Sequence, residues 1–142
     1  MCQLPAVVSM PFVQPNMSWY HTLVSPPLTP PDSVFGLMWG MLYLLLGISA
    51  AWIFCRGVDE KKHFAAWLLG IQLILNACWT PVFFGMHNLP LALAVVALML
   101  LTGFFMHRAF AKHSRLAAAL LWPYWLWLLF ATYLTAGFMM LN

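Results

Sequence analysis

Four stretches of this chain are each apolar and long enough to cross a lipid bilayer, and they dictate its fold class. A membrane-spanning helix needs about 20 mainly apolar residues, a condition met by residues 33–54, 64–86, 89–107 and 116–141. The apolar runs are continuous rather than alternating, which argues against membrane-spanning strands. Only 6% of the 142 residues are charged, whereas about 25% are charged in soluble domains. The sequence therefore predicts an all-α integral membrane protein in contact with the lipid bilayer, with one transmembrane domain over residues 1–142.

The N-terminal segment, residues 1–18, is apolar but offers less than a full span. Its uninterrupted apolar part, residues 4–13, is about half the required length, and it contains Pro5 and Pro11. Proline interrupts helical hydrogen bonding. The segment fits the end of a first helix, a re-entrant piece or a disordered lead. The expected architecture is a helical bundle of four full transmembrane helices preceded by a truncated first helix.

The basic residues predict the orientation of the bundle. All six lie in two segments between predicted spans, Arg56, Lys61 and Lys62 in residues 55–63 and Arg108, Lys112 and Arg115 in residues 107–115. Two crossings separate these segments, so both lie on one side, which the positive-inside rule assigns to the cytoplasm. Six basic residues are too few for a nucleic-acid-binding patch, so no nucleic-acid partner is expected.

Residues 19–32 form a proline-rich connection on the opposite side. Pro26, Pro27, Pro30 and Pro31 favour a stiff, extended path, and Trp19 suits the membrane interface. One interpretation is a proline linker within an aromatic belt. The other is a lid over a pocket that opens on this side. Either way, this Trp/Pro loop is expected to precede a helix that Asp32 or Ser33 caps.

The third apolar stretch, residues 64–86, carries a polar stripe. Gln72, Asn76 and Thr80 are spaced i, i+4, i+8, and Trp79 and Phe83 overlap their face. Polar groups in hydrocarbon cost free energy unless they have partners. For Gln72 and Asn76, an interhelical hydrogen bond and a ligand contact are equally consistent with the pattern. Pro81 should kink this helix.

Aromatic residues share faces of two other spans. Trp39 and Tyr43 are spaced i, i+4, and Tyr124, Trp127 and Ala131 are spaced i, i+3, i+7. Together with the polar stripe they predict a cavity between helices. Aromatic walls with one or two amides suit a planar, largely apolar ligand. The alternative is that these rings fill gaps between helices.

Two pairs of small residues have the spacing that permits close helix approach. They are Gly36 with Gly40 and Ala66 with Gly70. These pairs predict a homodimer through small-residue helix faces.

Signals for acid–base catalysis or metal binding are weak. The three acidic residues, Asp32, Asp59 and Glu60, lie outside the spans, and the five His lie at span ends or in loops. A buried carboxylate relay or a bis-His haem site at membrane depth is therefore not expected. The sequence predicts no catalytic residue, no metal site and no obligatory cofactor.

Three ordered motifs resemble a known family. They are Trp19-Tyr20-x-x-Leu23-x-x-Pro26 with Pro30-Pro31-x-x-Val34-Phe35 and Trp39-x-x-Leu42-Tyr43, then Gln72-Leu73-x-Leu75-Asn76-x-x-Trp79-Thr80-Pro81-Val82-Phe83-Phe84-Gly85, and finally Pro123-Tyr124-x-x-Trp127-x-x-Phe130-Ala131-Thr132-x-Leu134. From about residue 19 to residue 142 the chain resembles the TspO/MBR family of tryptophan-rich sensory and translocator proteins. It departs from that family in its short first helix.

The resemblance implies a five-helix membrane fold, a cavity capped by the Trp/Pro loop, and porphyrin or haem as ligand. It implies a tetrapyrrole-binding sensor or carrier in a bacterial cell membrane, involved in tetrapyrrole or stress regulation. Two alternatives are a non-catalytic assembly subunit of a pigment–protein complex and a light-dependent porphyrin-degrading enzyme. The predicted ligand-binding residues are Trp19, Trp39, Tyr43, Asn76, Trp79, Phe83, Tyr124, Trp127 and Ala131.

Overall fold

The computed structural model describes the backbone of residues 4–55 and 60–142, and the side chains of residues 11–55, 60 and 62–142. Within these ranges all regular structure is helical. The elements are α1 (Leu4–Tyr20), α2 (Asp32–Phe54), α3 (Glu60–Thr80), η1 (Pro81–Gly85), α4 (Leu89–His113), α5 (Arg115–Ala119) and α6 (Trp122–Leu141). The predictions for Arg56, Asp59 and the Lys61 side chain fall outside the described part of the chain.

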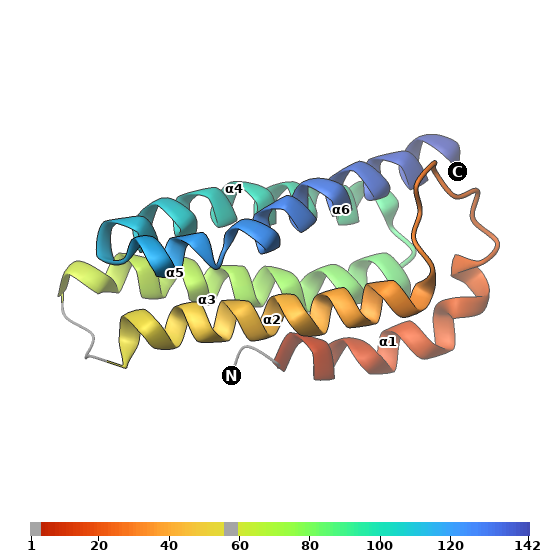
Figure 1. Ribbon diagram of the computed structural model, residues 1–142. Helices are drawn as coiled ribbons and strands as arrows, with labels where there is room; N and C mark the ends of the chain where they lie inside the picture. The colour runs from red at the N-terminus through yellow and green to blue at the C-terminus, as the bar shows by residue number, and fades with distance from the viewer. Residues whose placement is uncertain (1–3, 56–59) are drawn as a thin grey trace.

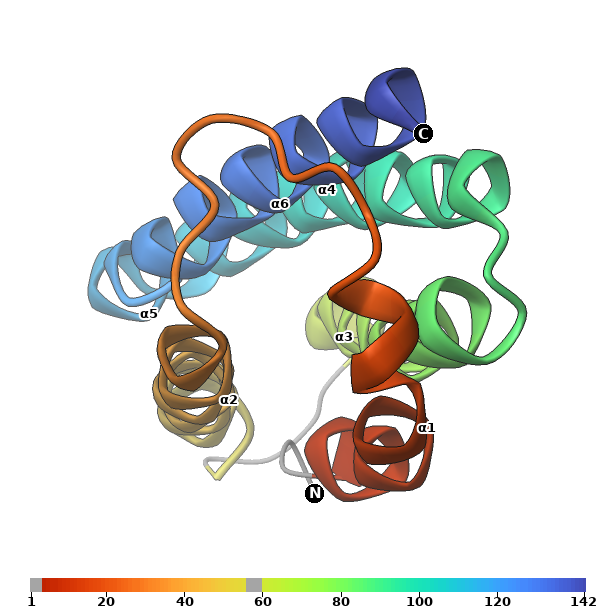
Figure 2. The same cartoon turned by 90° about the vertical axis from the view of Figure 1, so that its right-hand side faces the viewer.

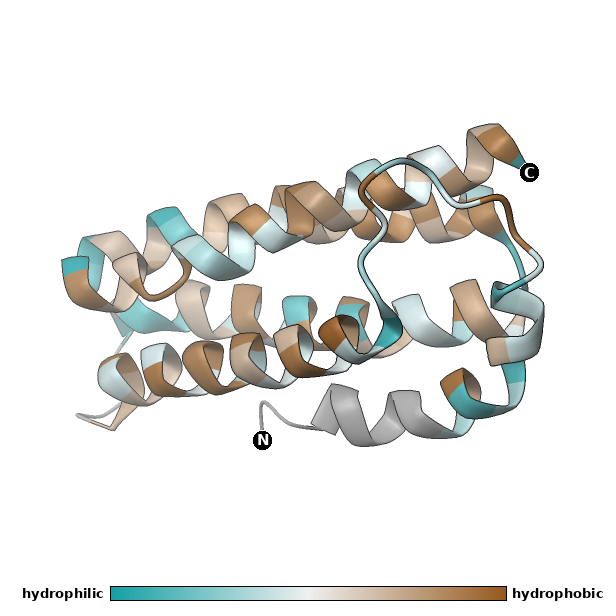
Figure 3. Ribbon diagram, turned by 45° about the vertical axis from the view of Figure 1, so that its right-hand side comes forward, coloured by the Kyte–Doolittle hydropathy of each residue, from teal (hydrophilic) through white to brown (hydrophobic). Residues whose placement is uncertain are grey.

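Four helical segments of the described chain are long and apolar enough to cross a membrane, which confirms the predicted all-α membrane fold. They are Asp32–Phe54, Lys62–Gly85, Leu89–His113 and Arg115–Leu141. Figure 3 shows hydrophobic residues along their lengths and hydrophilic residues mainly at the ends of the bundle and in the loop. The last span is interrupted at Leu120 and Leu121, between α5 and α6.

The fourth helix is longer than the sequence predicted. The expected connection over residues 107–115 is wrong in extent, because α4 continues to His113. Ser114 then separates the helices, and its Oγ accepts a hydrogen bond from the Ala117 backbone N–H at 3.2 Å, which caps α5. The basic residues Arg108 and Lys112 therefore lie on a helix and not in a loop.

The N-terminal segment forms a short first helix, as expected, but this helix ends later than the sequence predicted. α1 runs through Pro11 and Pro15 and ends at Tyr20, so the Trp/Pro loop occupies residues 21–31 rather than 19–32. Each proline removes one backbone donor, a cost that packing of α1 against α3 and η1 offsets. At 17 residues, α1 is shorter than the roughly 20 residues of a full span.

The bundle has two distinct ends (Figure 1). The Trp/Pro loop, η1 and the C-terminus lie at one end, and the last turn of α2, the first turn of α3 and the α4–α5 turn lie at the other. α4 packs against both α3 and α6 to form the core. Viewed onto the loop end, the chain passes from α1 over the end of α6 and then down to α2 (Figure 2). The loop thus covers one end of the bundle.

The helix type changes at Pro81, the position where the sequence predicts a kink. α3 ends at Thr80, and η1 continues as a π-helical turn in which the Met86 backbone N–H donates to the Pro81 carbonyl at 2.9 Å. A wider turn accommodates a residue that lacks a backbone N–H. It also orients Phe83 into the interior, where this ring is 2% exposed.

Helix α2 starts without the predicted side-chain cap. Pro31 occupies the N-cap position of α2, and no side chain caps the helix there. The prediction for Asp32 and Ser33 is therefore wrong. The Asp32 carboxylate instead pairs with His21, with 3.1 Å between Oδ2 and Nε2. This pair joins the beginning of the loop to the beginning of α2.

Candidate ligand-binding site

The polar stripe of α3 joins three helices. The Gln72 side chain is fully buried, and its Nε2 donates to the Met99 carbonyl at 3.1 Å and to the Tyr124 hydroxyl at 2.6 Å. Its Oε1 accepts a hydrogen bond from the Thr102 hydroxyl. These bonds satisfy the amide with α4 and α6. Of the two interpretations for Gln72, the geometry favours the interhelical one.

Asn76 has a different position in the same network. Its Nδ2 donates to the Gln72 carbonyl and to the Tyr124 hydroxyl, both at 2.7 Å. Its Oδ1 has only a long contact, 3.4 Å, with the Tyr43 hydroxyl. A carbonyl oxygen has two lone pairs, so Oδ1 retains capacity to accept a further hydrogen bond. Asn76 therefore joins helices through its nitrogen and presents its oxygen toward the space between them.

That space is a cavity of about 470 Å³ whose lining includes Tyr20 and Asp32, the residues on either side of the Trp/Pro loop. Its size lies in the range of about 300–1,000 Å³ typical of small-molecule sites. All major helices except α5 contribute to its wall, which is formed by Val13, Gln14, Met17, Tyr20, Asp32, Phe35, Gly36, Trp39, Gly40, Tyr43, Asn76, Trp79, Thr80, Phe83, Phe84, Met99, Ala131, Leu134, Thr135 and Phe138. Most of these side chains are apolar or aromatic.

Two stacked aromatic pairs form parts of the wall. On α2, Trp39 and Tyr43 stack with ring centroids 5.5 Å apart and an interplanar angle of 27°. On α3 and η1, Trp79 and Phe83 stack at 5.1 Å and 24°. The i, i+4 spacing holds each pair on one face. The two pairs give the cavity flat aromatic surfaces.

The structure brings six of the nine predicted ligand-binding residues to the cavity wall, namely Trp39, Tyr43, Asn76, Trp79, Phe83 and Ala131. The other three lie next to it. Tyr124 is buried behind Asn76 in the hydrogen-bond network. Trp127 packs edge-on against Trp39 at 6.4 Å. Trp19 stacks on His87 at 3.9 Å and contacts the edge of Phe83 at 5.9 Å. These three residues support the wall rather than form it.

Two hydrogen-bond donors of the wall are buried without a partner among the described residues, Tyr20 Oη and Trp79 Nε1. An unsatisfied buried donor is costly, so a partner such as a bound ligand is expected. Tyr20 lies at the end of α1, outside the four spans. Burial, assisted by the Asp32 carboxylate, raises the pKa of the Tyr20 phenol to about 12. Tyr20 therefore stays protonated and able to donate at neutral pH.

Sequence reasoning missed the contribution of α1 to this site. Val13, Met17 and Tyr20 line the cavity, and their i, i+4, i+7 spacing is the signal that could have revealed them. Two prolines made the segment look irregular. Gly36 and Gly40, predicted as a helix-contact pair, also line the cavity, and nothing lies within 4 Å of a Cβ built at either position. Their missing side chains leave space for a ligand.

The Trp/Pro loop is attached to α6 at successive points. The Val24 backbone N–H donates to Asn142 Oδ1 at 2.8 Å, and Asn142 Nδ2 donates to the Val24 carbonyl at 3.1 Å. The Tyr133 hydroxyl donates to the Pro27 carbonyl at 2.9 Å. Between these points, Pro26 sits directly over Gly137. These contacts favour the lid interpretation of the loop.

Gly137→Ala should loosen the lid. A Cβ at residue 137 would lie 2.6 Å from Pro26 Cβ, so the loop must move. Because overpacking costs about 1–3 kcal/mol, we expect about tenfold faster amide hydrogen exchange in residues 22–29. Gly70→Ala is the matched control, since a Cβ there meets nothing within 4 Å. Equal exchange rates in the wild-type protein and Gly137→Ala would contradict the lid attachment.

Comparison with known proteins finds one matching family model and several relatives that align with most of the chain. A family model described as the TspO/MBR family matches residues 1–141. A tryptophan-rich protein TspO of Chlorobaculum tepidum is 36% identical over 146 aligned positions, covering 100% of this chain and 91% of the relative. A tryptophan-rich sensory protein of Cereibacter sphaeroides is 37% identical, covering 99% and 86%. A human translocator protein is 38% identical, covering 82% and 70%.

Proposed function

Because the chain belongs to the TspO/MBR family, we propose that it is a membrane sensor or carrier that binds a porphyrin in the cavity next to the Trp/Pro loop. The observation that carries the proposal is the pair of aromatic stacks, Trp39 with Tyr43 and Trp79 with Phe83, that wall one cavity. A flat, conjugated ring system is the ligand class that such surfaces suit. The names of two relatives, a sensory protein and a translocator protein, are consistent with sensing or transport.

The polar groups of the cavity also suit a porphyrin. Tyr20 Oη and Trp79 Nε1 are donors without partners in the described chain, and porphyrin carboxylates accept hydrogen bonds. Asn76 Oδ1 can accept one from a pyrrole N–H. No His is among the described residues that line the cavity, so these residues fit a metal-free porphyrin without providing the imidazole ligand that haem iron commonly takes.

Protoporphyrin IX should quench the tryptophan fluorescence of the purified protein saturably, with one porphyrin bound per chain. Quenching is expected because the ligand would lie against Trp39 and Trp79. The measurement is a fluorescence titration in detergent, kept in the dark, with a straight-chain fatty acid as control because it shares the carboxylate but lacks the flat ring. Linear, unsaturable quenching, or equal competition by the fatty acid, would refute the proposed ligand class.

Illumination of the porphyrin-bound protein, together with analysis of co-purifying partners, separates the alternative functions. A light-dependent porphyrin-degrading enzyme would lose the porphyrin absorption spectrum under illumination and retain it in the dark. A non-catalytic assembly subunit would show no saturable binding and would co-purify with a stable partner. Binding that persists under light favours the sensor or carrier.

The proposal also covers the orientation of the bundle in the membrane and its assembly into a homodimer. The basic residues at the α4–α5 end predict that this end faces the cytoplasm of a bacterial cell. The proposed homodimer uses the small-residue pairs Ala66 with Gly70 and Gly36 with Gly40, the second of which also lines the cavity. The mass of the protein in detergent solution tests this assembly.

A further inference from the structure

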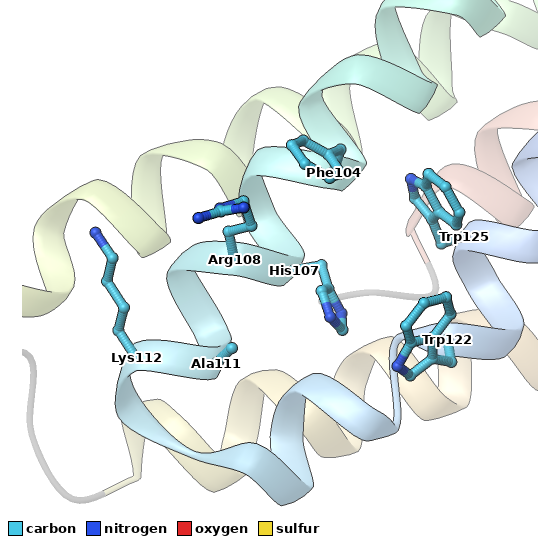
Figure 4. A pocket seen from close by; sticks show the side chains of 7 residues that line it. All are labelled: Phe104, His107, Arg108, Ala111, Lys112, Trp122 and Trp125. Carbon is cyan, nitrogen blue, oxygen red and sulfur yellow. The ribbon is translucent and has the colours of Figure 1, made fainter.

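A second hollow, of about 500 Å³, lies on the outside of the bundle between α4 and the start of α6. It is far along the helices from the loop end, and it shares no residue with the porphyrin cavity. Figure 4 shows its side chains, contributed by Phe104, His107, Arg108, Ala111, Lys112, Trp122 and Trp125. We call this hollow the basic groove.

One edge of the basic groove is cationic. Arg108 and Lys112 are spaced i, i+4 on α4, so they share a face. Like charges at this spacing destabilise a helix. Among the described residues no carboxylate forms an ion pair with either side chain. The Arg108 guanidinium lies over the Phe104 ring, 5.8 Å from its centroid. An anion between the two cations would relieve their repulsion.

The rest of the groove is aromatic. Phe104 and Trp125 lie with ring centroids 6.4 Å apart, and Trp125 meets Trp122 at 5.9 Å with perpendicular rings. His107 packs against Trp122 at 5.2 Å. Trp122 remains 51% exposed. A charged edge next to an aromatic surface is the chemistry that recognises an anionic amphiphile.

The position along α4 places the two parts of the groove at different depths. A helix rises about 1.5 Å per residue, so Arg108 lies roughly 29 Å along the axis from Leu89. The hydrocarbon core is about 30 Å thick. Arg108 and Lys112 therefore reach the headgroup layer, while Phe104 and Trp125 lie beside the upper acyl chains. Positive-inside orientation directs this end to the leaflet that carries anionic lipids.

We infer that the basic groove is a binding site for an anionic phospholipid, with the phosphate held by Arg108 and Lys112 and the glycerol and acyl region against Trp122 and Trp125. This inference goes beyond the proposed porphyrin binding and does not depend on it. A headgroup phosphate matches the paired cations, and the lipid tails match the aromatic surface. The groove thus distinguishes a lipid from a small soluble anion by requiring both contacts.

Native mass spectrometry of the detergent-solubilised protein tests the inference. We expect phosphatidylglycerol to bind about tenfold more tightly than phosphatidylcholine, and Arg108→Gln with Lys112→Gln to abolish this preference. The matched control is Lys62→Gln with Arg115→Gln, which removes two charges from the same end but none from the groove. Trp122→Ala should weaken binding of both lipids, because it removes part of the apolar contact.

Three results would overturn the inference. One is equal affinity of the wild-type protein for the two lipids. Another is an equal loss of preference in both double variants, which would indicate attraction by net charge alone. The last is displacement of phosphatidylglycerol by millimolar inorganic phosphate, which would show that the groove binds a free anion. Circular dichroism and gel filtration of each variant, measured in parallel, report whether the fold is retained.

Discussion

Trp39→Ala combined with Trp79→Ala is expected to weaken protoporphyrin IX binding by about tenfold or more. The two indoles belong to the two aromatic stacks of the cavity wall. Each ring contributes about 1 kcal/mol of stacking beyond its buried area, and a loss of about 1.4 kcal/mol is a tenfold change in Kd. Fluorescence of the remaining tryptophans, or porphyrin absorption after gel filtration, measures the affinity.

Trp52→Ala with Trp67→Ala is the control for this experiment. Both residues lie on the same two helices, α2 and α3, but are 48% and 72% exposed on the outside of the bundle. We expect this variant to bind porphyrin as the wild-type protein does. If both double variants lose affinity equally, the ligand is bound elsewhere. If neither does, the aromatic stacks serve only to pack helices.

Gln72→Leu is expected to lower the free energy of unfolding by about 2 kcal/mol. Leucine is of similar size, but it cannot form the hydrogen bonds that Gln72 makes with Met99, Tyr124 and Thr102. Interhelical hydrogen bonds in membranes are each worth about 0.6 kcal/mol on average and up to about 1.7, and buried partners left unsatisfied add to the cost. Unfolding by sodium dodecyl sulfate, followed by circular dichroism, measures the change.

Thr132→Val separates the interhelical effect from the loss of any hydroxyl or amide. The Thr132 hydroxyl donates to the Leu128 carbonyl at 2.7 Å within the same helix. Its removal should change the free energy of unfolding by less than about 0.5 kcal/mol. A similar loss in Gln72→Leu and Thr132→Val would mean that the network around Gln72 does not hold α3, α4 and α6 together.

Features set by continuous apolar length or by helical spacing were predictable. The four spans follow from length and composition, and the structure confirms that such helices are present. The faces of Trp39 with Tyr43 and of Asn76 with Trp79 follow from a period of 3.6 residues, and these residues meet at one cavity. Helix spacing specifies which side chains share a face, and here it identified six of the twenty wall residues.

Features that depend on tertiary compensation were not predictable. The helical state of α1 rests on contacts with α3 and η1 that offset two prolines, and local propensity cannot anticipate such contacts. The division of roles between Gln72 and Asn76 is of the same kind. Both amides lie on one face, but only the placement of Tyr124 and Thr102 determines that Gln72 is satisfied by other helices.

The boundary of α4 shows a further limit. Charge and polarity suggested that the helix ends where hydrocarbon ends, at about residue 107. Backbone hydrogen bonding continues to His113, because a helix can extend into the headgroup layer without losing any bonds. The end of an apolar run therefore marks the edge of the bilayer rather than the end of the helix.

Helix α6 both lines the cavity and contacts the Trp/Pro loop. α6 contributes Ala131 and Leu134 to the cavity, and the loop is hydrogen-bonded to Tyr133 of this helix and to Asn142, the residue that follows it. A ligand in the cavity and the Trp/Pro loop would therefore both contact α6. If a ligand in the cavity stabilises the closed loop, linkage requires that closure of the loop strengthens ligand binding by the same free energy.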